Sequence, residues 1–202
     1  MKKSSCKFSL YLMTTFLVFF LANTIHLYAQ DKEVTKEKNE GHYGLKAGIN
    51  FAELWGKDAL PESDRKVGYS FGVYATYKIS KEWKLQPEVI WSLQGEKSKE
   101  SGRYKISYIN IPVMFKWKSN KFYTELGPQF GILTMNTAKS VPDDLRIENF
   151  ETFDFSLNAG LGYEIFEDWS IGARYVQGVT NIVRGRDLRN SVIYVGISYR
   201  IF

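Results

Sequence analysis

Apolar side chains recur at every second position along most of the chain after residue 41, and no helical period fits this alternation. The clearest stretch runs from Thr152 to Ile165, where large apolar side chains alternate with Asp, Ser, Asn, Gly and Glu. A period of two is typical of β-strands whose two faces contact different surroundings. The pattern predicts eight strands, which cover residues 42–51, 67–79, 83–94, 104–117, 122–133, 152–165, 169–179 and 190–202.

The segments between these strands alternate between long and short, with 15, 3, 9, 4, 18, 3 and 10 residues in chain order. This asymmetry is typical of up-and-down membrane barrels, whose short turns face the periplasm and whose long loops face outward. No stretch after residue 41 approaches the roughly eighteen consecutive apolar residues of a membrane-spanning helix. Insertion of this part of the chain into a membrane would therefore use strands. We therefore predict an all-β fold, an eight-stranded antiparallel up-and-down transmembrane β-barrel over residues 42–202, in the Gram-negative outer membrane with periplasmic termini.

Glycine indicates which face of the strands is inside. A soluble lipocalin-like barrel would also alternate, with its apolar set facing inward. Glycine weakens a solvent-facing strand surface, whereas the narrow lumen of an eight-stranded barrel needs small residues beside large ones. None of the glycines falls on the apolar set, and eleven of the sixteen fall on the polar set: positions 44, 48, 68, 72, 127, 131, 160, 162, 172, 178 and 196. The polar set is therefore predicted to line the lumen and the apolar set to face lipid.

Three tryptophans support this orientation. Trp83 and Trp169 directly follow short turns, Trp117 directly precedes one, and all three share the outward parity. They predict one aromatic girdle at the periplasmic interface. The chain ends on an aromatic residue, Phe202, which is a cue for the barrel insertion machinery, although its parity is inward.

Two features disturb the regular pattern. Pro87, Pro112 and Pro128 lie inside predicted strands, where each lacks a ladder donor, so we expect a bulge or local irregularity at each. In residues 104–117 the apolar parity changes near Tyr108, which predicts either a phase shift there or a first half that stands above the membrane.

The N-terminal segment predicts export. Three lysines precede an apolar run from Phe8 to Ala22, and small residues follow it, so residues 1–29 are predicted to be a cleaved signal peptide. Its removal would take away the only cysteine, Cys6, and lower the formal charge from +5 to +2, so nucleic acid is not an implied partner. Residues 30–41 are charged and are predicted to form a solvated periplasmic tail.

The inward parity carries a mixture of basic and acidic side chains. They suit either an ion-selective pore or a network of ion pairs that fills the lumen, and the narrow bore of eight strands favours the network. The predicted network comprises Lys46, Lys78, Lys84, Glu88, Lys116, Glu125, Asp154, Glu164, Arg174 and Arg200. His42 is the only histidine after the signal, so no catalytic, cofactor or metal site is predicted.

The long loops carry three candidate binding features. Arg184, Arg186 and Arg189 in the last loop could bind lipopolysaccharide phosphates or an acidic partner, although solubilising charge is the favoured explanation. The third loop, residues 134–151, is acidic, and a calcium site there is weighed against plain solvation. Trp55 in the first loop could anchor a protein partner or fold back onto the barrel rim.

Five motifs within the strands resemble those of a known family: GLKAGINFAEL (Gly44 to Leu54), YINIPVMFKWK (Tyr108 to Lys118), YTELGPQFGIL (Tyr123 to Leu133), FDFSLNAGLGYEI (Phe153 to Ile165) and ARYVQGVTNI (Ala173 to Ile182). Over essentially the whole mature chain, the sequence resembles the PorT-like outer-membrane β-barrel family typical of Bacteroidota. This resemblance implies the barrel fold and no shared substrate. The namesake's association with protein secretion adds an export role to the alternatives.

The sequence thus predicts a non-enzymatic surface or assembly component that interacts through its long extracellular loops. Its expected partners are outer-membrane lipid, lipopolysaccharide, the barrel insertion machinery through the C-terminal strand, and a surface or secretion protein. The alternatives are an accessory factor in protein secretion, a narrow porin for small solutes, and a periplasmic lipocalin-like binder.

Overall fold

The computed structural model describes residues 41–59, 64–98, 102–139 and 150–201. The predicted signal peptide, residues 30–40 of the predicted tail and Phe202 lie outside the described residues. No helix among the described residues is long and apolar enough to cross a membrane.

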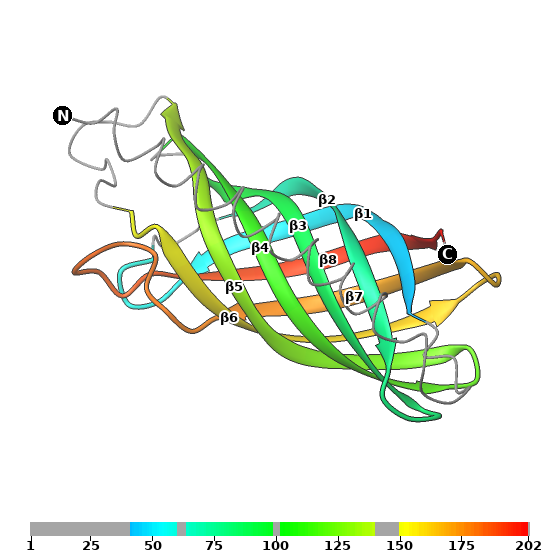
Figure 1. The fold of residues 1–202 in the computed structure, drawn as a ribbon. Helices are drawn as coiled ribbons and strands as arrows, with labels where there is room; N and C mark the ends of the chain where they lie inside the picture. The colour runs from blue at the N-terminus through cyan, green and yellow to red at the C-terminus, as the bar shows by residue number, and fades with distance from the viewer. Residues whose placement is uncertain (1–40, 60–63, 99–101, 140–149, 202) are drawn as a thin grey trace. The chain divides into compact units, whose positions relative to one another are not determined.

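Eight antiparallel strands form a closed barrel in which each strand pairs with its sequence neighbours and β8 returns to pair with β1 (Figure 1). This arrangement confirms the predicted eight-stranded up-and-down barrel. The strands are β1 (His42–Trp55), β2 (Asp64–Lys78), β3 (Trp83–Ser98), β4 (Gly102–Ser119), β5 (Phe122–Lys139), β6 (Phe153–Glu164), β7 (Trp169–Gly178) and β8 (Arg189–Arg200).

The two faces of the wall differ as the alternation predicts. In β6, Phe153 and Leu157 are 68% and 51% exposed. Ser156 and Asn158, the two residues that flank Leu157, are each 1% exposed. The same contrast of exposed apolar and buried polar side chains runs around the whole barrel. The apolar set therefore forms the outer wall, and the polar set fills the lumen.

Glycine makes room for large side chains in this lumen. A Cβ on Gly162 would stand 2.2 Å from Cζ of the Tyr123 ring, which is far below any normal contact. Tyr123 comes from the neighbouring strand β5 and is 5% exposed. The polar-set glycine thus lets an aromatic ring from the next strand lie across the lumen.

Several strands are longer than the alternation predicts, mainly at the long-loop end. β3, β4 and β5 continue to Ser98, from Gly102 and to Lys139, and they extend past their neighbours in Figure 1. Several pairs in this extension are polar on both strands, such as Asp64 with Lys97 and Lys97 with Arg103. Backbone hydrogen bonds hold such pairs without an apolar face, so periodicity does not reveal them.

The three strand prolines interrupt the ladders without shifting their register. Between β3 and β4 the pairing passes from Pro87 with Val113 to Ile90 with Asn110, and the register is unchanged. Equivalent gaps adjoin Pro112 and Pro128 between β4 and β5. The missing proline N–H explains the gaps. The expected irregularities are therefore present, but as skipped pairs rather than bulges.

The predicted shift near Tyr108 is present between β4 and β5, whose register changes between Ser107 and Tyr108, and absent between β4 and β3. β4 keeps one register with β3 from Trp83–Trp117 to Ser98–Gly102, so Ile106 and Tyr108 share the inward parity of the lower strand. The irregularity lies in β5, where Ser107 pairs with Met135 and Tyr108 with Leu133, which leaves Thr134 between them.

Candidate functional site: the lumen and the long-loop end

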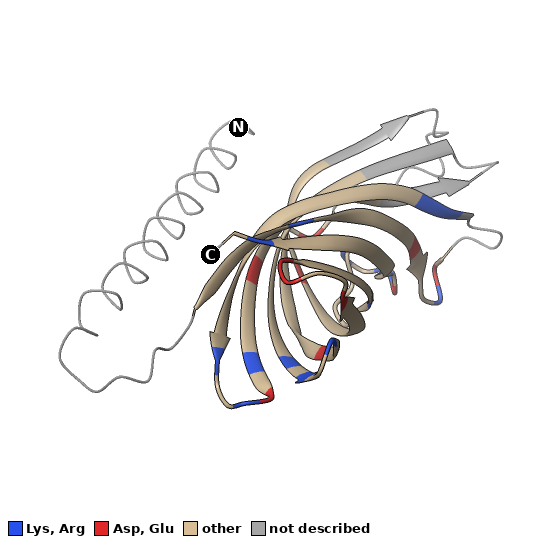
Figure 2. Cartoon of the chain, turned by 90° about the vertical axis from the view of Figure 1, so that its right-hand side faces the viewer, with Lys and Arg blue, Asp and Glu red and all other residues tan. Residues whose placement is uncertain are grey.

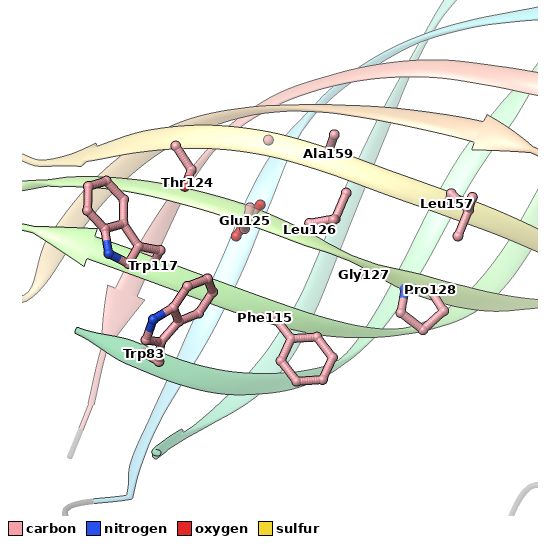
Figure 3. Close-up of a pocket in the computed structure, with 11 residues that line it drawn as sticks. Trp83, Phe115, Trp117, Thr124, Glu125, Leu126, Gly127, Pro128, Leu157 and Ala159 are labelled. Atoms are coloured by element: carbon pink, nitrogen blue, oxygen red, sulfur yellow. The ribbon is translucent and has the colours of Figure 1, made fainter. Parts of the chain in front are cut away.

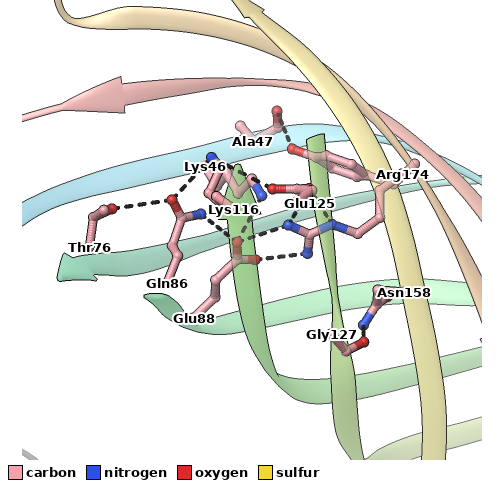
Figure 4. Close-up of polar contacts among 11 residues, drawn as sticks. Lys46, Ala47, Thr76, Gln86, Glu88, Lys116, Glu125, Gly127, Asn158 and Arg174 are labelled. Atoms are coloured by element: carbon pink, nitrogen blue, oxygen red, sulfur yellow. Dashed lines mark hydrogen bonds and ion pairs between the residues drawn. The ribbon is translucent and has the colours of Figure 1, made fainter. Parts of the chain in front are cut away.

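A group of five charged side chains crosses the middle of the lumen. Arg174 donates from Nη1 and Nη2 to the two carboxylate oxygens of Glu88, at 2.9 Å each, and from Nε to Oε1 of Glu125 at 2.8 Å. Lys46 Nζ lies 2.9 Å from Glu88 Oε1, and Lys116 Nζ lies 3.6 Å from Glu125 Oε2 (Figure 4). We call these five residues the central charge cluster.

The central charge cluster joins opposite walls of the barrel. Glu88 lies on β3 and Arg174 on β7, which are four strands apart in a ring of eight. The side chains of Glu88, Arg174 and Glu125 are 0%, 3% and 4% exposed. Paired guanidinium–carboxylate bonds are directional as well as strong, so they fix the two walls relative to each other. The cluster occupies the bore at this depth.

The other residues of the predicted network lie elsewhere. Glu164 pairs with Lys118 at 2.5 Å, and Arg200 pairs with Asp168 at 3.1 Å, both at the short-turn end. Among the described residues, Lys78 and Lys84 form no ion pair. The predicted single network is therefore divided, because charged side chains of one parity are spread over the height of the barrel.

Asp154 is held by neutral groups instead of a cation. It accepts hydrogen bonds from Thr180 Oγ1 at 2.9 Å, Ser156 Oγ at 3.2 Å and Asn190 Nδ2 at 3.3 Å. No ion pair joins it to a described residue. The prediction that Asp154 belongs to the ion-pair network is therefore wrong, because its partners are the neutral side chains of Thr180, Ser156 and Asn190.

A second layer, which is apolar, lies at the long-loop end. It consists of residues that are at most 5% exposed: Leu54, Ile106, Tyr108, Ile182, Val183 and Leu188. Ala59, Leu133 and Phe150 pack against it. Three of its members come from the last long loop, so this loop folds inward. We call the six residues the loop-end apolar cluster.

Hydrogen bonds from backbone N–H groups connect three long loops above this cluster. Glu151 N donates to Ile182 O at 2.8 Å, and Asp187 N donates to Asp58 Oδ2 at 2.7 Å. Gly56 has φ 136°, and a Cβ there would stand 1.9 Å from Asp187 O, so only glycine fits. The described parts of the first, third and last loops therefore form one surface.

The three candidate arginines of the last loop are not equivalent. Arg184 Nε donates to Glu151 Oε1 at 3.0 Å, and this hydrogen bond raises the pKa of the guanidinium above its ordinary value. Arg189 pairs with Asp187 at 3.1 Å and lies 5.1 Å from the Trp55 ring. Arg186 forms no ion pair with a described residue and is exposed. The structure therefore does not gather the three into one open anion site.

Trp55 lies at the end of β1 rather than in a free loop, and it is 39% exposed. Its neighbour Leu54 is buried in the loop-end apolar cluster. In the third loop, Asp143, Asp144 and Glu148 lie outside the described residues, and Glu151 binds Arg184. Among the residues that the structure describes, no three His, Cys, Asp or Glu side chains gather as a metal site would need.

The three girdle tryptophans lie on the outer wall beside the short turns. Trp83 and Trp117 are register partners on β3 and β4, and they are 47% and 38% exposed. Trp169 is 43% exposed and packs against Tyr199, with ring centroids 4.8 Å apart and the rings tilted by 42°. Indole rings at this height suit a membrane interface.

The loop-end apolar cluster is the feature that the sequence reasoning missed. Ile106 and Tyr108 were visible as apolar residues on the inward parity, and Ile182 and Leu188 as apolar residues in a loop. Apolar residues on the inward parity and apolar residues in a loop together indicate a buried cluster, since apolar side chains on a polar face pack against one another.

Residues 28–184 match the family described as outer membrane protein beta-barrel domain. The chain belongs to this family. The match covers β1 to β7, and β8 closes the barrel beyond it. The exposed apolar side chains on the outside of the barrel therefore form the surface that contacts the outer membrane. No curated protein matches the chain.

One solved structure supports the fold, and a second is similar. Neisserial surface protein A aligns with a TM-score of 0.56 and 13% identity, over 79% of this chain and 97% of that chain. Ail, the attachment invasion locus protein of Yersinia pestis, aligns with a TM-score of 0.49 and 14% identity, over 80% of this chain and 99% of that chain. At these identities the first alignment bears on the fold alone.

Proposed function

We propose that this family member is a non-enzymatic surface component of the Gram-negative outer membrane, a closed barrel that interacts through its long-loop end. The observation that carries the proposal is the central charge cluster. In it, Arg174 on β7 binds Glu88 on β3, the strand on the opposite side of the barrel. A lumen filled in this way leaves the exposed loops as the part of the molecule available to a partner.

The filled lumen disfavours the narrow-porin alternative. Eight strands enclose a space just wide enough for side chains, and open aqueous channels need about sixteen. Here the bore holds two layers, the central charge cluster and the loop-end apolar cluster. A permeating solute would have to separate buried ion pairs and then cross an apolar layer.

The loop end suits recognition because its described parts are held together. Residues 56–59, 150–152 and 180–188 share hydrogen bonds, so a partner would meet a preformed surface. On it, Arg186 is exposed and suits a phosphate of lipopolysaccharide. Neisserial surface protein A, whose name describes a surface protein, shares the fold. We also propose, from the five strand motifs given in the sequence analysis, that the chain is a PorT-like protein within this family.

The lengths of the connections support an orientation in the membrane. We infer that the long loops face the cell exterior and that the short turns and both termini face the periplasm, as in other membrane barrels. The C-terminal strand β8 then presents its end to the insertion machinery.

Surface labelling tests the orientation. Single cysteines are introduced by Arg186→Cys at the long-loop end and Ser119→Cys at the short-turn end, in a chain whose native cysteine is replaced by Cys6→Ser. A membrane-impermeant maleimide is expected to label Arg186→Cys on intact cells and Ser119→Cys only after lysis. The opposite pattern would contradict the proposed orientation.

A clean deletion strain tests the secretion alternative. The proteins in the medium and on the surface are compared between the parent, the deletion strain and the complemented strain. The proposal predicts an unchanged set of exported proteins. Loss of a defined set, restored on complementation, would transfer the protein to the secretion-accessory class.

A further inference from the structure

A depression of about 620 Å³ interrupts the outer wall next to the girdle (Figure 3). It spans β3 to β6 on the lipid-facing side, and its sides are large apolar residues, among them Trp83, Phe115 and Leu157. Its volume lies within the range of about 300–1,000 Å³ that is usual for small-molecule sites. We call it the wall groove.

The wall groove exists because two outward positions carry small side chains. Thr124 on β5 and Ala159 on β6 line it, and each is surrounded by bulky neighbours on the same face. Thr124 is the register partner of Trp117, and Ala159 is the register partner of Leu126. The small residues therefore form a floor between aromatic and aliphatic side chains, and the lining is almost wholly apolar.

Positive charge gathers just beyond the tryptophan end of the groove. Residues 78–82 and 118–121, which form two short turns and their flanks, carry four lysines and one acid, Glu82. A hydrogen bond of 2.9 Å from Lys118 N to Glu82 O places the two turns side by side. Figure 2 shows Lys and Arg positions, with Asp and Glu among them, at several strand ends and turns of the barrel.

Three of the four lysines, Lys78, Lys81 and Lys121, are exposed and form no ion pair with a described residue, and Lys81 and Lys121 lie in the turns themselves. Lys118 is paired with Glu164, and Glu82 accepts a hydrogen bond from the Trp117 indole at 3.4 Å. The remaining short turn, residues 165–168, carries two acids and no base, so the excess of positive charge is confined to the groove side.

We propose that the wall groove holds one acyl chain of an anionic glycerophospholipid from the leaflet at the short-turn end, with Lys81 and Lys121 binding its phosphate. The apolar groove lies on the membrane-facing wall, and the lysines lie where a headgroup would be, on the water side of Trp83 and Trp117. The order of apolar groove, indole belt and cations matches the order of chain, interface and phosphate in a lipid. This proposal rests on the outer-membrane location but not on which side the loops face.

Native mass spectrometry of the full chain in detergent tests the proposal. The protein is titrated with phosphatidylglycerol and, separately, with phosphatidylethanolamine of the same acyl chains. Tighter binding of phosphatidylglycerol is expected. The variant Lys81→Gln/Lys121→Gln should lose this preference by up to about thirtyfold, because each lysine near a membrane surface contributes about fivefold to anionic lipid binding.

Filling the groove tests the acyl-chain part independently. Thr124→Leu/Ala159→Leu should weaken the binding of both lipids, whereas Ala47→Leu/Ala173→Leu, at outward positions on other strands, should not. Lys57→Gln/Arg186→Gln, which removes two cations at the long-loop end, is the matched charge control. Folding of each variant is verified by heat-dependent gel mobility, and Ala159→Leu alone replaces the double variant if the latter does not fold.

Three outcomes would overturn the proposal. Equal binding of the two lipids by the wild-type protein would remove the headgroup selectivity. Unchanged binding in Lys81→Gln/Lys121→Gln would show that these lysines are not the phosphate site. Loss of selectivity in the lysine variant together with unchanged binding in the groove variant would mean charge attraction at the surface without a chain in the groove. None of these outcomes depends on the loops, so each is distinct from failure of the proposed function.

Discussion

Arg174→Met is the substitution that tests the central charge cluster most sharply. It removes three hydrogen bonds, two to Glu88 and one to Glu125, from a site where all three side chains are at most 4% exposed. Methionine fills much of the volume of the arginine stem, so the change is mainly one of charge and hydrogen bonding.

The expected loss follows from what the carboxylates keep. Glu88 retains Lys46 at 2.9 Å and Gln86 at 2.6 Å, and Glu125 retains Lys116 at 3.6 Å. Removing one partner from a buried ion pair costs about 3–5 kcal/mol, since the other charge stays buried with fewer partners. We expect a loss of about this size in the free energy of unfolding. Arg174→Lys should cost less, because it keeps the charge but loses the paired geometry.

The assay is urea unfolding of the full chain in lipid vesicles, followed by tryptophan fluorescence under conditions where unfolding and refolding coincide. Lys118→Met is the matched control, because Lys118 pairs with Glu164 with both side chains 29% exposed. Partly exposed pairs contribute about 0–1 kcal/mol. The reasoning is refuted if Arg174→Met lies within about 1 kcal/mol of the wild type, or if Lys118→Met costs as much as Arg174→Met.

Three further predictions concern the long-loop end. Gly56→Ala should loosen the loops and speed their cleavage in limited proteolysis, because a Cβ at φ 136° would stand 1.9 Å from Asp187 O; Gly185→Ala, at φ 77° with no atom within 4 Å, should have a smaller effect, and equal cleavage of the two variants would contradict the close-contact argument. Ile106→Ala should lower the free energy of unfolding by about 2–5 kcal/mol, as expected for a buried isoleucine, and a wild-type unfolding curve would argue against a packed cluster. Arg184→Gln should leave the unfolding midpoint unchanged, because this side chain is 80% exposed, and a clear shift would assign the Arg184 ion pair a structural role.

The strand pattern could be predicted because the membrane imposes it. A strand that contacts lipid on one face needs apolar side chains at every second position. Phe153 and Leu157 are such positions, and both are exposed on the outer wall. Parity also selects the inward charges, but it does not give their height or partners. Glu88 and Arg174 are 86 residues apart and meet only because β3 and β7 are opposite in the closed ring.

The loop-end apolar cluster could not be predicted from the same rule, which takes an apolar residue to face lipid. Ile106 and Tyr108 break that rule because loop residues cover them. Ile182 and Leu188 lie in a connection without periodicity, so nothing local in the sequence places them over the lumen. The prediction for Asp154 is wrong for a related reason. Its hydrogen-bond partners Thr180 and Asn190 are positioned by the path of the last loop into β8, which the sequence pattern does not give.

Single-channel recording measures the central claim, a closed lumen, most directly. The full chain is inserted into planar lipid bilayers, with folding verified by heat-dependent gel mobility and a sixteen-stranded porin as the positive control. The account predicts no steady current from the folded protein, because the central charge cluster and the loop-end apolar cluster both fill the bore. Large, steady currents that rise with the amount of inserted protein would contradict it.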